Sequence, residues 1–196
     1  MALITDTLDR SADTESDLIP ALADRWSPRG FDRDAVIDEA VLTTVLEAAR
    51  WAPSAGNIQP ARFILGRRGS WQFQVIESHL IDFNRTWASA ASVLIVNITE
   101  TESSGKDNPW ATYDLGQAVA HLSVQAQHEG LHSHQMGGID APGLAAVFEL
   151  EANHEVVSVT ALGVLADVAT IDPALLKREI APRSRTPLSA LLIQSD

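Results

Sequence analysis

The chain has 196 residues, of which 45% are hydrophobic, and its formal net charge is −12. A chain of this length can bury its own core as one domain, and the lack of cysteine excludes disulfides, iron–sulfur clusters and a cysteine nucleophile, which favours a reducing cytoplasm. The acidic balance argues against nucleic acid or an anionic membrane as partner, and the sequence contains neither a transmembrane-length apolar run nor a signal-peptide pattern.

The first half of the chain predicts an acidic arm followed by two helices and a strand. Residues 1–24 are acidic and indicate a solvated arm with a short helix over 17–23, and residues 25–196 are expected to form a single domain. From Asp38, a good N-cap, apolar residues recur at helical spacing as far as Pro53. A proline-bounded loop over 53–60 leads to a strand over 62–66, and a helix is predicted over 70–82.

The second half predicts alternating strands and helices. Residues 91–98 are continuous and β-branched, which is typical of a fully buried strand. A polar surface loop follows over 101–109, then a long helix over 112–129 that ends at Gly130. The remaining predictions are a strand over 131–136, a Gly137-Gly138 turn, a helix capped by Asp140, a strand over 156–165 and a short helix over 173–180. Dinucleotide and P-loop glycine motifs are missing, so the pattern indicates an α+β fold with a mixed sheet under two long helices.

The first candidate site is the segment Arg25-Trp26-Ser27-Pro28-Arg29. Of the 14 basic residues only Lys106 and Lys177 are lysine, and the arginine fork suits phosphate and carboxylate. In an extended segment Arg25, Ser27 and Arg29 point to one side, where they could hold a phosphate and a polar ring. The alternative is a solvated basic turn that pairs with neighbouring aspartates.

Two further segments are candidates for ligand contact. In the loop over 53–60, prolines at both ends leave Ser54, Asn57 and backbone amides free to contact a ligand, although an ordinary connection would read the same way. In the tail, Arg183 and Arg185 are spaced for one face, which is also common in a solvated charge pair. Arg62 is a further base that could join an electropositive cleft formed by the other arginines.

The histidines and aromatic residues leave alternatives open. His132 and His134 share one face of a strand with His128 close behind, which could form a metal site, but no third ligand is fixed and we expect no metal. The aromatic residues that flank the segment between the second strand and the long helix fit a substrate face and a plain core equally. They are Phe83, Trp87, Trp110 and Tyr113.

Taken in order, these motifs resemble the FMN-dependent nitroreductase family. The order is the R-x-S-x-R segment, a helix that ends in AARWAPSAGNIQP, the MGGID turn and the late R-x-R pair, from Arg25 to about Leu192. The resemblance implies a nitroreductase-like fold, with a mostly antiparallel sheet in a three-layer α/β/α arrangement. It also implies a homodimer with its active site at the subunit interface.

The resemblance assigns roles to individual residues. It implies that Arg25 and Ser27, with Trp26 between them, hold the FMN phosphate and ribityl chain, and that Arg29 lies at the pyrimidine edge of the flavin. Arg183 and Arg185 would complete the phosphate site. The other implied cofactor residues are Asn84 at the flavin ring, Gly137 and Gly138 at flavin N5, and Pro53, Ser54, Ala55 and Asn57, which would reach the cofactor from the partner subunit.

The implied activity is a ping-pong oxidoreductase. NADPH or NADH would deliver hydride to flavin N5, and an electron-poor acceptor such as a nitroaromatic or a quinone would then take the electrons. The cofactor carries this chemistry, so no catalytic side chain is required. The alternatives are a flavin-binding carrier or sensor without efficient turnover, and a dehydrogenase or dehalogenase of the same family.

Overall fold

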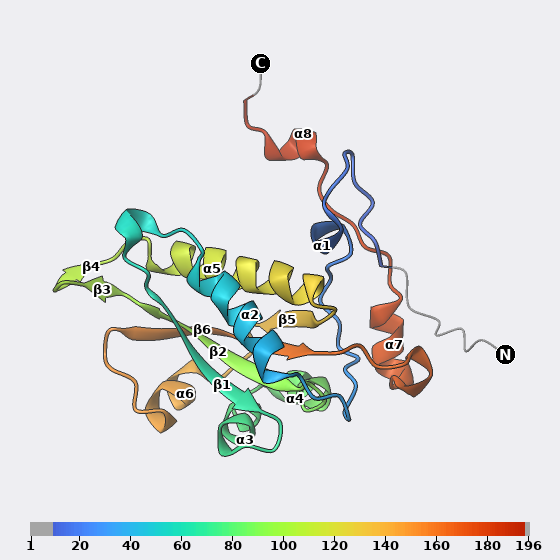
Figure 1. Ribbon diagram of the computed structural model, residues 1–196, viewed down its shortest axis with the longest axis horizontal. Helices are drawn as coiled ribbons and strands as arrows, with labels where there is room; N and C mark the ends of the chain where they lie inside the picture. The colour runs from blue at the N-terminus through green and yellow to red at the C-terminus, as the bar shows by residue number, and fades with distance from the viewer. Residues whose placement is uncertain (1–9, 195–196) are drawn as a thin grey trace.

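The computed structural model describes residues 10–194, which form an antiparallel sheet with helices on both faces (Figure 1). The four strands are ordered β1 (Ala61–Arg67), β2 (Val93–Glu100), β6 (His154–Gly163) and β5 (His132–Met136). Each neighbouring pair in this order is antiparallel. The predicted α+β class and mostly antiparallel sheet are therefore confirmed, but within these residues the sheet is not mixed, because all three of its strand pairs are antiparallel.

Strand β2 forms the centre of the core because its side chains alternate between two apolar layers. Leu94, Val96 and Ile98 belong to one buried cluster, and Val93 and Ile95 belong to the other. Each aliphatic side chain fully buried in this way contributes about 1.5–3 kcal/mol. The continuous apolar run predicted as a buried strand therefore contributes side chains to the core on both faces of the sheet.

The helices divide between the two faces and give the predicted three layers. Helices α3 (Trp71–Ser78), α4 (Asp82–Ala88) and α6 (Ala141–Val147) supply the first cluster, and α2 (Glu39–Arg50) and α5 (Ala111–His128) supply the second. The Asp38 side chain accepts a hydrogen bond from Ala40 N, and the Asp140 side chain accepts one from Gly143 N, so both predicted caps are confirmed.

Two predicted elements differ from the structure. The helix predicted over 70–82 ends earlier, at Ser78, and is followed by a separate helix, α4, that was not predicted. Between the two helices Ile81 is extended, and its N–H donates to the carbonyl of Gly138. The loop predicted over 101–109 contains a small hairpin, β3 (Glu102–Ser103) and β4 (Lys106–Asp107). Ser104 and Gly105 both have positive φ, as a tight hairpin turn requires.

The two ends of the described chain run beside each other (Figure 1). Arg10 Nη1 donates to the carbonyl of Ala181 at 2.6 Å, and Leu188 N donates to Glu15. The short elements in or near these ends are α1 (Pro20–Ala23), η2 (Val168–Thr170), α7 (Pro173–Glu179) and α8 (Leu188–Leu191). Residues 1–9 of the predicted arm lie outside the described residues. Within residues 10–194, no helix has both the length and the apolar character needed to cross a membrane.

Candidate functional site

The segment over 25–30 lies outside the helices and strands, and its side chains alternate between the interior and the surface. Trp26, Pro28 and Gly30 are buried, whereas Arg25, Ser27 and Arg29 are partly exposed. Arg25 Nη1 lies 3.4 Å from Ser27 Oγ, so these two side chains lie together. The predicted alternation therefore holds, and Trp26 packs inward with the Arg10 guanidinium 5.1 Å from its ring.

Side chains from distant parts of the chain hold the backbone of this segment. Arg183 Nη2 donates to the carbonyl of Arg25 at 3.0 Å, and His134 Nδ1 lies 2.8 Å from the carbonyl oxygen of Pro28. The carboxylate of Glu179 accepts from the N–H of Arg29 and of Gly30. The tail, β5 and α7 thus meet at one stretch of backbone.

The arginines gathered here form an excess of positive charge. Burial lowers the pKa of Arg25, and the charge of Arg185 lowers it further. Burial also lowers the pKa of Arg183, as do Arg25, Arg185 and Arg10, while Asp24 opposes them. Mutual repulsion among arginines is relieved when an anion binds between them. The donor set therefore fits a phosphate dianion.

Arg29 extends from the same segment toward an aromatic surface. Its guanidinium lies 5.9 Å from the ring centres of both Phe83 and Trp87, and Arg178 lies 4.8 Å from the Phe83 ring. Burial and Arg178 lower the pKa of Arg29, and Glu179 raises it. Arg29 Nε is buried and has no hydrogen-bond partner within residues 10–194. A polar ring beside it would supply such a partner.

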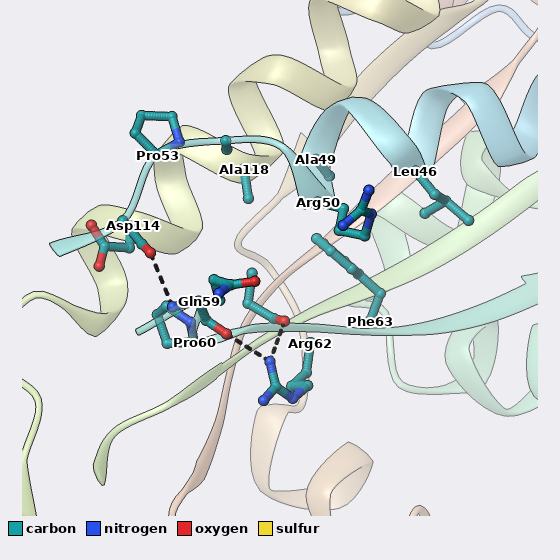
Figure 2. A pocket seen from close by; sticks show the side chains of 13 residues that line it. Leu46, Ala49, Arg50, Pro53, Gln59, Pro60, Arg62, Phe63, Asp114 and Ala118 are labelled. Atoms are coloured by element: carbon teal, nitrogen blue, oxygen red, sulfur yellow. Dashed lines mark hydrogen bonds between the residues drawn. The ribbon is translucent and has the colours of Figure 1, made fainter. Parts of the chain in front are cut away.

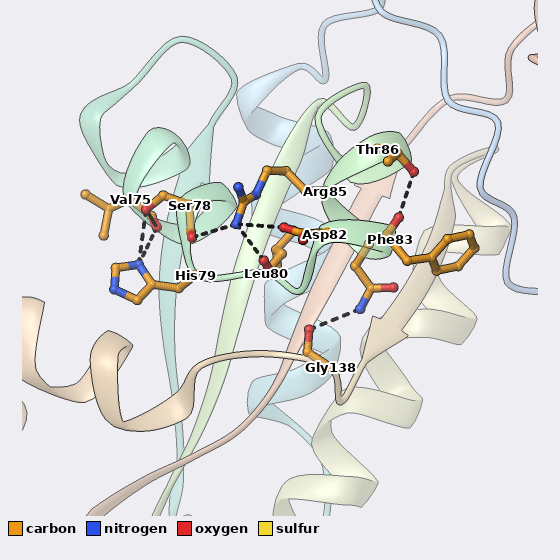
Figure 3. A network of polar contacts seen from close by, with 10 residues as sticks. Val75, Ser78, His79, Leu80, Asp82, Phe83, Arg85, Thr86 and Gly138 are labelled. Atoms are coloured by element: carbon orange, nitrogen blue, oxygen red, sulfur yellow. Dashed lines mark hydrogen bonds and ion pairs between the residues drawn. The ribbon is translucent and has the colours of Figure 1, made fainter.

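The glycine turn after β5 is fixed against α4. Asn84 Nδ2 donates to the carbonyl of Gly138 at 3.1 Å (Figure 3). A Cβ at Gly138 would lie 2.5 Å from Ile81 Cδ1, whereas one at Gly137 would meet nothing within 4 Å. The fold thus brings Asn84 to the turn and leaves open space at Gly137.

The two strand histidines are neutral at pH 7. Burial and the charge of Arg25 lower the pKa of His132 to about 4. The pKa of His134 is also lowered to about 4, because burial and the charges of Arg29 and Arg25 lower it, whereas the hydrogen bond to Pro28 raises it. Because Pro28 offers a carbonyl oxygen, His134 carries its proton on Nδ1. Among the described residues, no group of three or more His, Cys, Asp or Glu side chains could hold a metal ion.

The proline-bounded loop has a strained backbone at its centre. Gly56, Asn57 and Gln59 all have φ between 55° and 58°, a left-handed conformation that costs non-glycine residues free energy. Ala55 N donates to Asp114 Oδ2 at 3.0 Å, and Ser54 Oγ accepts from Gln59 N at 3.0 Å. The loop, which contains η1 (Ala55–Asn57), is therefore held in one shape.

This loop borders a cavity of about 190 Å³ between α2, α5 and β1 (Figure 2). Pro53, Ser54 and Arg62 are among the lining residues, and the exposed Asn57 is not. Arg62 pairs with Glu100 at 2.9 Å and donates to the carbonyls of Gln59 and Ala61. The interpretation that Arg62 joins the other arginines in one cleft is wrong within a single chain.

The loop and the arginines lie at opposite ends of the sheet. The loop leads into Ala61, which pairs with Thr99, and Thr99 pairs with Glu155. The ring of Trp26 contacts His132, which pairs with Gly163 at the other end of β6. At about 3.3 Å per strand residue, the two ends of β6 are more than 20 Å apart. Residues 53–57 thus belong to one region. Contacts place the following residues in another: Arg25, Ser27, Arg29, Asn84, Gly138, Arg183 and Arg185.

Sequence reasoning missed two buried carboxylates at these regions. Glu179 is 0% exposed and binds the backbone at Arg29, and Asp114 is 3% exposed and binds the loop at Ala55. Both had a signal in the sequence. Asp114 precedes Leu115 and Ala118 on the apolar face of a predicted helix, and Glu179 ends a helix, where an acidic residue opposes the helix dipole.

Comparison with known proteins gives consistent matches. The sequence pattern of the Nitroreductase family matches residues 22–72 and 80–164. An uncharacterized 15.4 kDa protein of Mycolicibacterium smegmatis is 34% identical over 135 residues, which cover 65% of this chain and 90% of that protein.

Solved structures of similar proteins match nearly the whole chain. An oxidoreductase containing FMN has 33% sequence identity and a TM-score of 0.86, over 93% of this chain and 94% of that chain. A mutant of an FMN and NADPH-dependent nitroreductase from a Sphigopyxis strain has 18% identity and a TM-score of 0.71, over 90% of this chain and 97% of that chain, and shares the fold.

Proposed function

Since the chain belongs to the nitroreductase family, we propose that it is an FMN-dependent oxidoreductase with NADPH or NADH as electron donor. The proposed acceptor is an electron-poor compound such as a nitroaromatic or a quinone. The observation that carries the proposal is the group of arginines around Arg25, in which burial and neighbouring arginines lower the pKa of both Arg25 and Arg183. The similar oxidoreductase that contains FMN supports the choice of cofactor.

Each part of this region would hold a different part of the cofactor. Arg25, Ser27 and Arg185 present cationic and hydroxyl donors suited to the phosphate. Arg29 would place a fixed positive charge at the pyrimidine edge of the ring, which favours the reduced, anionic flavin. When bound, FMN supplies a ring that accepts hydride at N5 and passes two electrons onward.

The glycine turn would orient the reactive side of the ring. Gly137 leaves room for a planar group close to the backbone, and the bond from Asn84 to Gly138 fixes the turn. A backbone N–H that faces N5 orients this atom without supplying a titrating acid. His132 and His134, which stay neutral at pH 7, add no charge there.

We propose further that the protein works as a homodimer in the cytoplasm. Pro53, Ser54, Ala55 and Asn57 of one subunit would reach the cofactor of the other. The separation of the loop from the arginines supports this, because one chain alone does not bring both regions together. The cysteine-free sequence supports a reducing compartment.

An absorbance spectrum of the purified protein, before and after addition of NADPH or NADH, tests the proposal. We expect a yellow protein that releases FMN on denaturation and is bleached by at least one of the two nicotinamides. A colourless protein whose Tm does not rise with FMN would contradict the proposed function. Bound FMN that neither nicotinamide reduces would instead support a carrier or sensor.

A further inference from the structure

The carboxylate of Glu179 binds the backbone of the segment that carries Arg29. Both of its oxygens lie 3.1 Å from Arg29 N, and one lies 3.4 Å from Gly30 N. Directly after these two N–H groups the segment pairs with residues 164–166. The carbonyl of Gly30 accepts from Ala166 N, and Phe31 forms a β-bridge with Leu165. Glu179 thus satisfies the two N–H groups that directly precede this pairing.

Burying a carboxylate at this position costs free energy, which its hydrogen bonds must offset. Glu179 is 0% exposed and lies at the C-terminal end of α7, where the helix dipole disfavours negative charge. Burial raises its pKa, while the N–H groups of Arg29 and Gly30 and the charges of Arg29 and Arg10 lower it. An apolar residue would avoid the cost of burying a charge but would leave two N–H groups without an acceptor.

The region around α7 also packs closely on the surroundings of Arg29. A Cβ at Gly30 would lie 2.6 Å from Ile171 Cδ1, just before α7. Arg178, next to Glu179, lies 4.8 Å from the Phe83 ring, and Arg29 lies 5.9 Å from the same ring. Helix α7 therefore contacts the backbone of Arg29 through Glu179, and Arg178 of the same helix shares the Phe83 ring with the Arg29 side chain.

We propose that Glu179 is a positioning residue of the cofactor site. It fixes the backbone from which Arg29 extends, and its negative charge offsets part of the positive charge that Arg29 and Arg178 bring to the flavin. The inference rests on the proposed function, in which Arg29 lies at the pyrimidine edge of FMN.

The test compares E179Q and E179A with E151Q, a control that removes an exposed carboxylate far from this region. E179Q keeps an oxygen acceptor but loses the charge, so the reduced, anionic flavin becomes favoured. We expect it to prefer reduced over oxidised FMN about tenfold more than the wild type, which raises the two-electron midpoint potential by about 30 mV. For E179A we expect about tenfold weaker FMN binding and faster amide exchange at Arg29 and Gly30 in the apoprotein.

The outcomes separate this inference from the function on which it rests. If the wild type takes up no FMN, the proposed function fails and the cofactor role of Glu179 fails with it. If the wild type binds FMN but E179Q has the same potential as E151Q, the inference alone is overturned. Weaker FMN binding with an unchanged potential would mark Glu179 as merely structural and would also overturn it. Should E179A not fold, E179Q provides the potential and the affinity.

Discussion

At the scale of single residues, the two arginines of the tail have different surroundings. Arg183 is partly buried, and its guanidinium donates to the carbonyls of Arg10, Ala23 and Arg25. Arg185 is exposed and donates to the adjacent carbonyl of Ser184. A sequence motif treats these arginines as an equivalent pair, but the structure gives one of them three backbone partners.

We therefore expect the two alanine variants to separate stability from cofactor binding. Arg183→Ala leaves three carbonyls without this donor and should lower the free energy of unfolding of the apoprotein by about 1–3 kcal/mol. Arg185→Ala should change that stability by less than about 0.5 kcal/mol and weaken FMN binding instead. Denaturant unfolding and FMN titration measure both effects, and equal losses of stability in the two variants would contradict this prediction.

His132 should make the protein sensitive to acid. Its pKa is about 4 in the folded protein, below the ordinary value of 6.5, so the unfolded chain takes up this proton first. Stability is therefore retained above pH 6.5 and falls as the pH drops from 6.5 toward 4. For His132 the loss should reach about 2 kcal/mol at pH 5.

The variant His132→Gln tests this contribution in the apoprotein. Between pH 7.5 and pH 5 it should lose less free energy of unfolding than the wild type does, by up to about 2 kcal/mol. Exposed His128 provides the control, because His128→Gln should retain the acid sensitivity of the wild type. The same pH dependence in all three proteins would refute the role of His132.

At the scale of elements, close contact between β1 and α3 depends on one glycine. A Cβ at Gly66 would lie 2.5 Å from Phe73 N and 2.6 Å from Phe73 Cα, both of which belong to a helix backbone. Helix backbone atoms cannot move away from an added Cβ by a rotamer change, as the end of a flexible side chain can. The start of α3 is further fixed by its Ser70 cap, which accepts from Phe73 N.

Gly66→Ala should consequently lower the free energy of unfolding by about 2–3 kcal/mol, because α3 must move off the sheet. Gly116→Ala is the matched control, since a Cβ there meets nothing within 4 Å and the residue lies inside α5. It should stabilise the protein by about 0.5–1 kcal/mol through the better helix propensity of alanine. Thermal or denaturant unfolding distinguishes them, and a Gly66→Ala variant as stable as the wild type would exclude the contact.

The elements themselves follow largely from local signals. The β-branched run of β2 and the caps Asp38 and Asp140 act within a few residues, so the sequence predicts them. The break between α3 and α4 depends instead on Gly138, which accepts a hydrogen bond from Ile81 N (Figure 3 shows the surrounding contacts). A partner more than fifty residues away leaves no local pattern, so the predicted helix continues to residue 82 and α4 is not predicted.

At the scale of the whole molecule, mixed dimers test whether one site uses two chains. One variant would carry Arg25→Ala and Arg29→Ala, and the other Ser54→Ala and Asn57→Ala. Each homodimer would have two damaged sites. In a mixed dimer the damaged arginines of one chain and the damaged loop of the other fall in the same site, so the second site combines an intact loop with intact arginines. We expect the mixed dimers to recover about half of the wild-type FMN reduction by NADPH or NADH, with the dimer mass confirmed by light scattering.

Two results would count against the shared site. Mixed dimers no more active than either homodimer would show that the loop does not serve the cofactor of the partner. An FMN-loaded monomer in light scattering would contradict the dimer itself.

The sequence by itself determined which residues make up the proposed cofactor region and the class of fold that carries it. Period-two alternation makes Arg25, Ser27 and Arg29 face outward while Trp26 packs inward, and apolar periodicity defines the layers. Only the tertiary structure decided that Glu179 holds the backbone at Arg29 and that the loop around Ser54 lies at the other end of the sheet from the arginines. The physical reason is that periodicity and capping are local, whereas the partner of a buried charge and the distance between two motifs depend on how the whole chain packs.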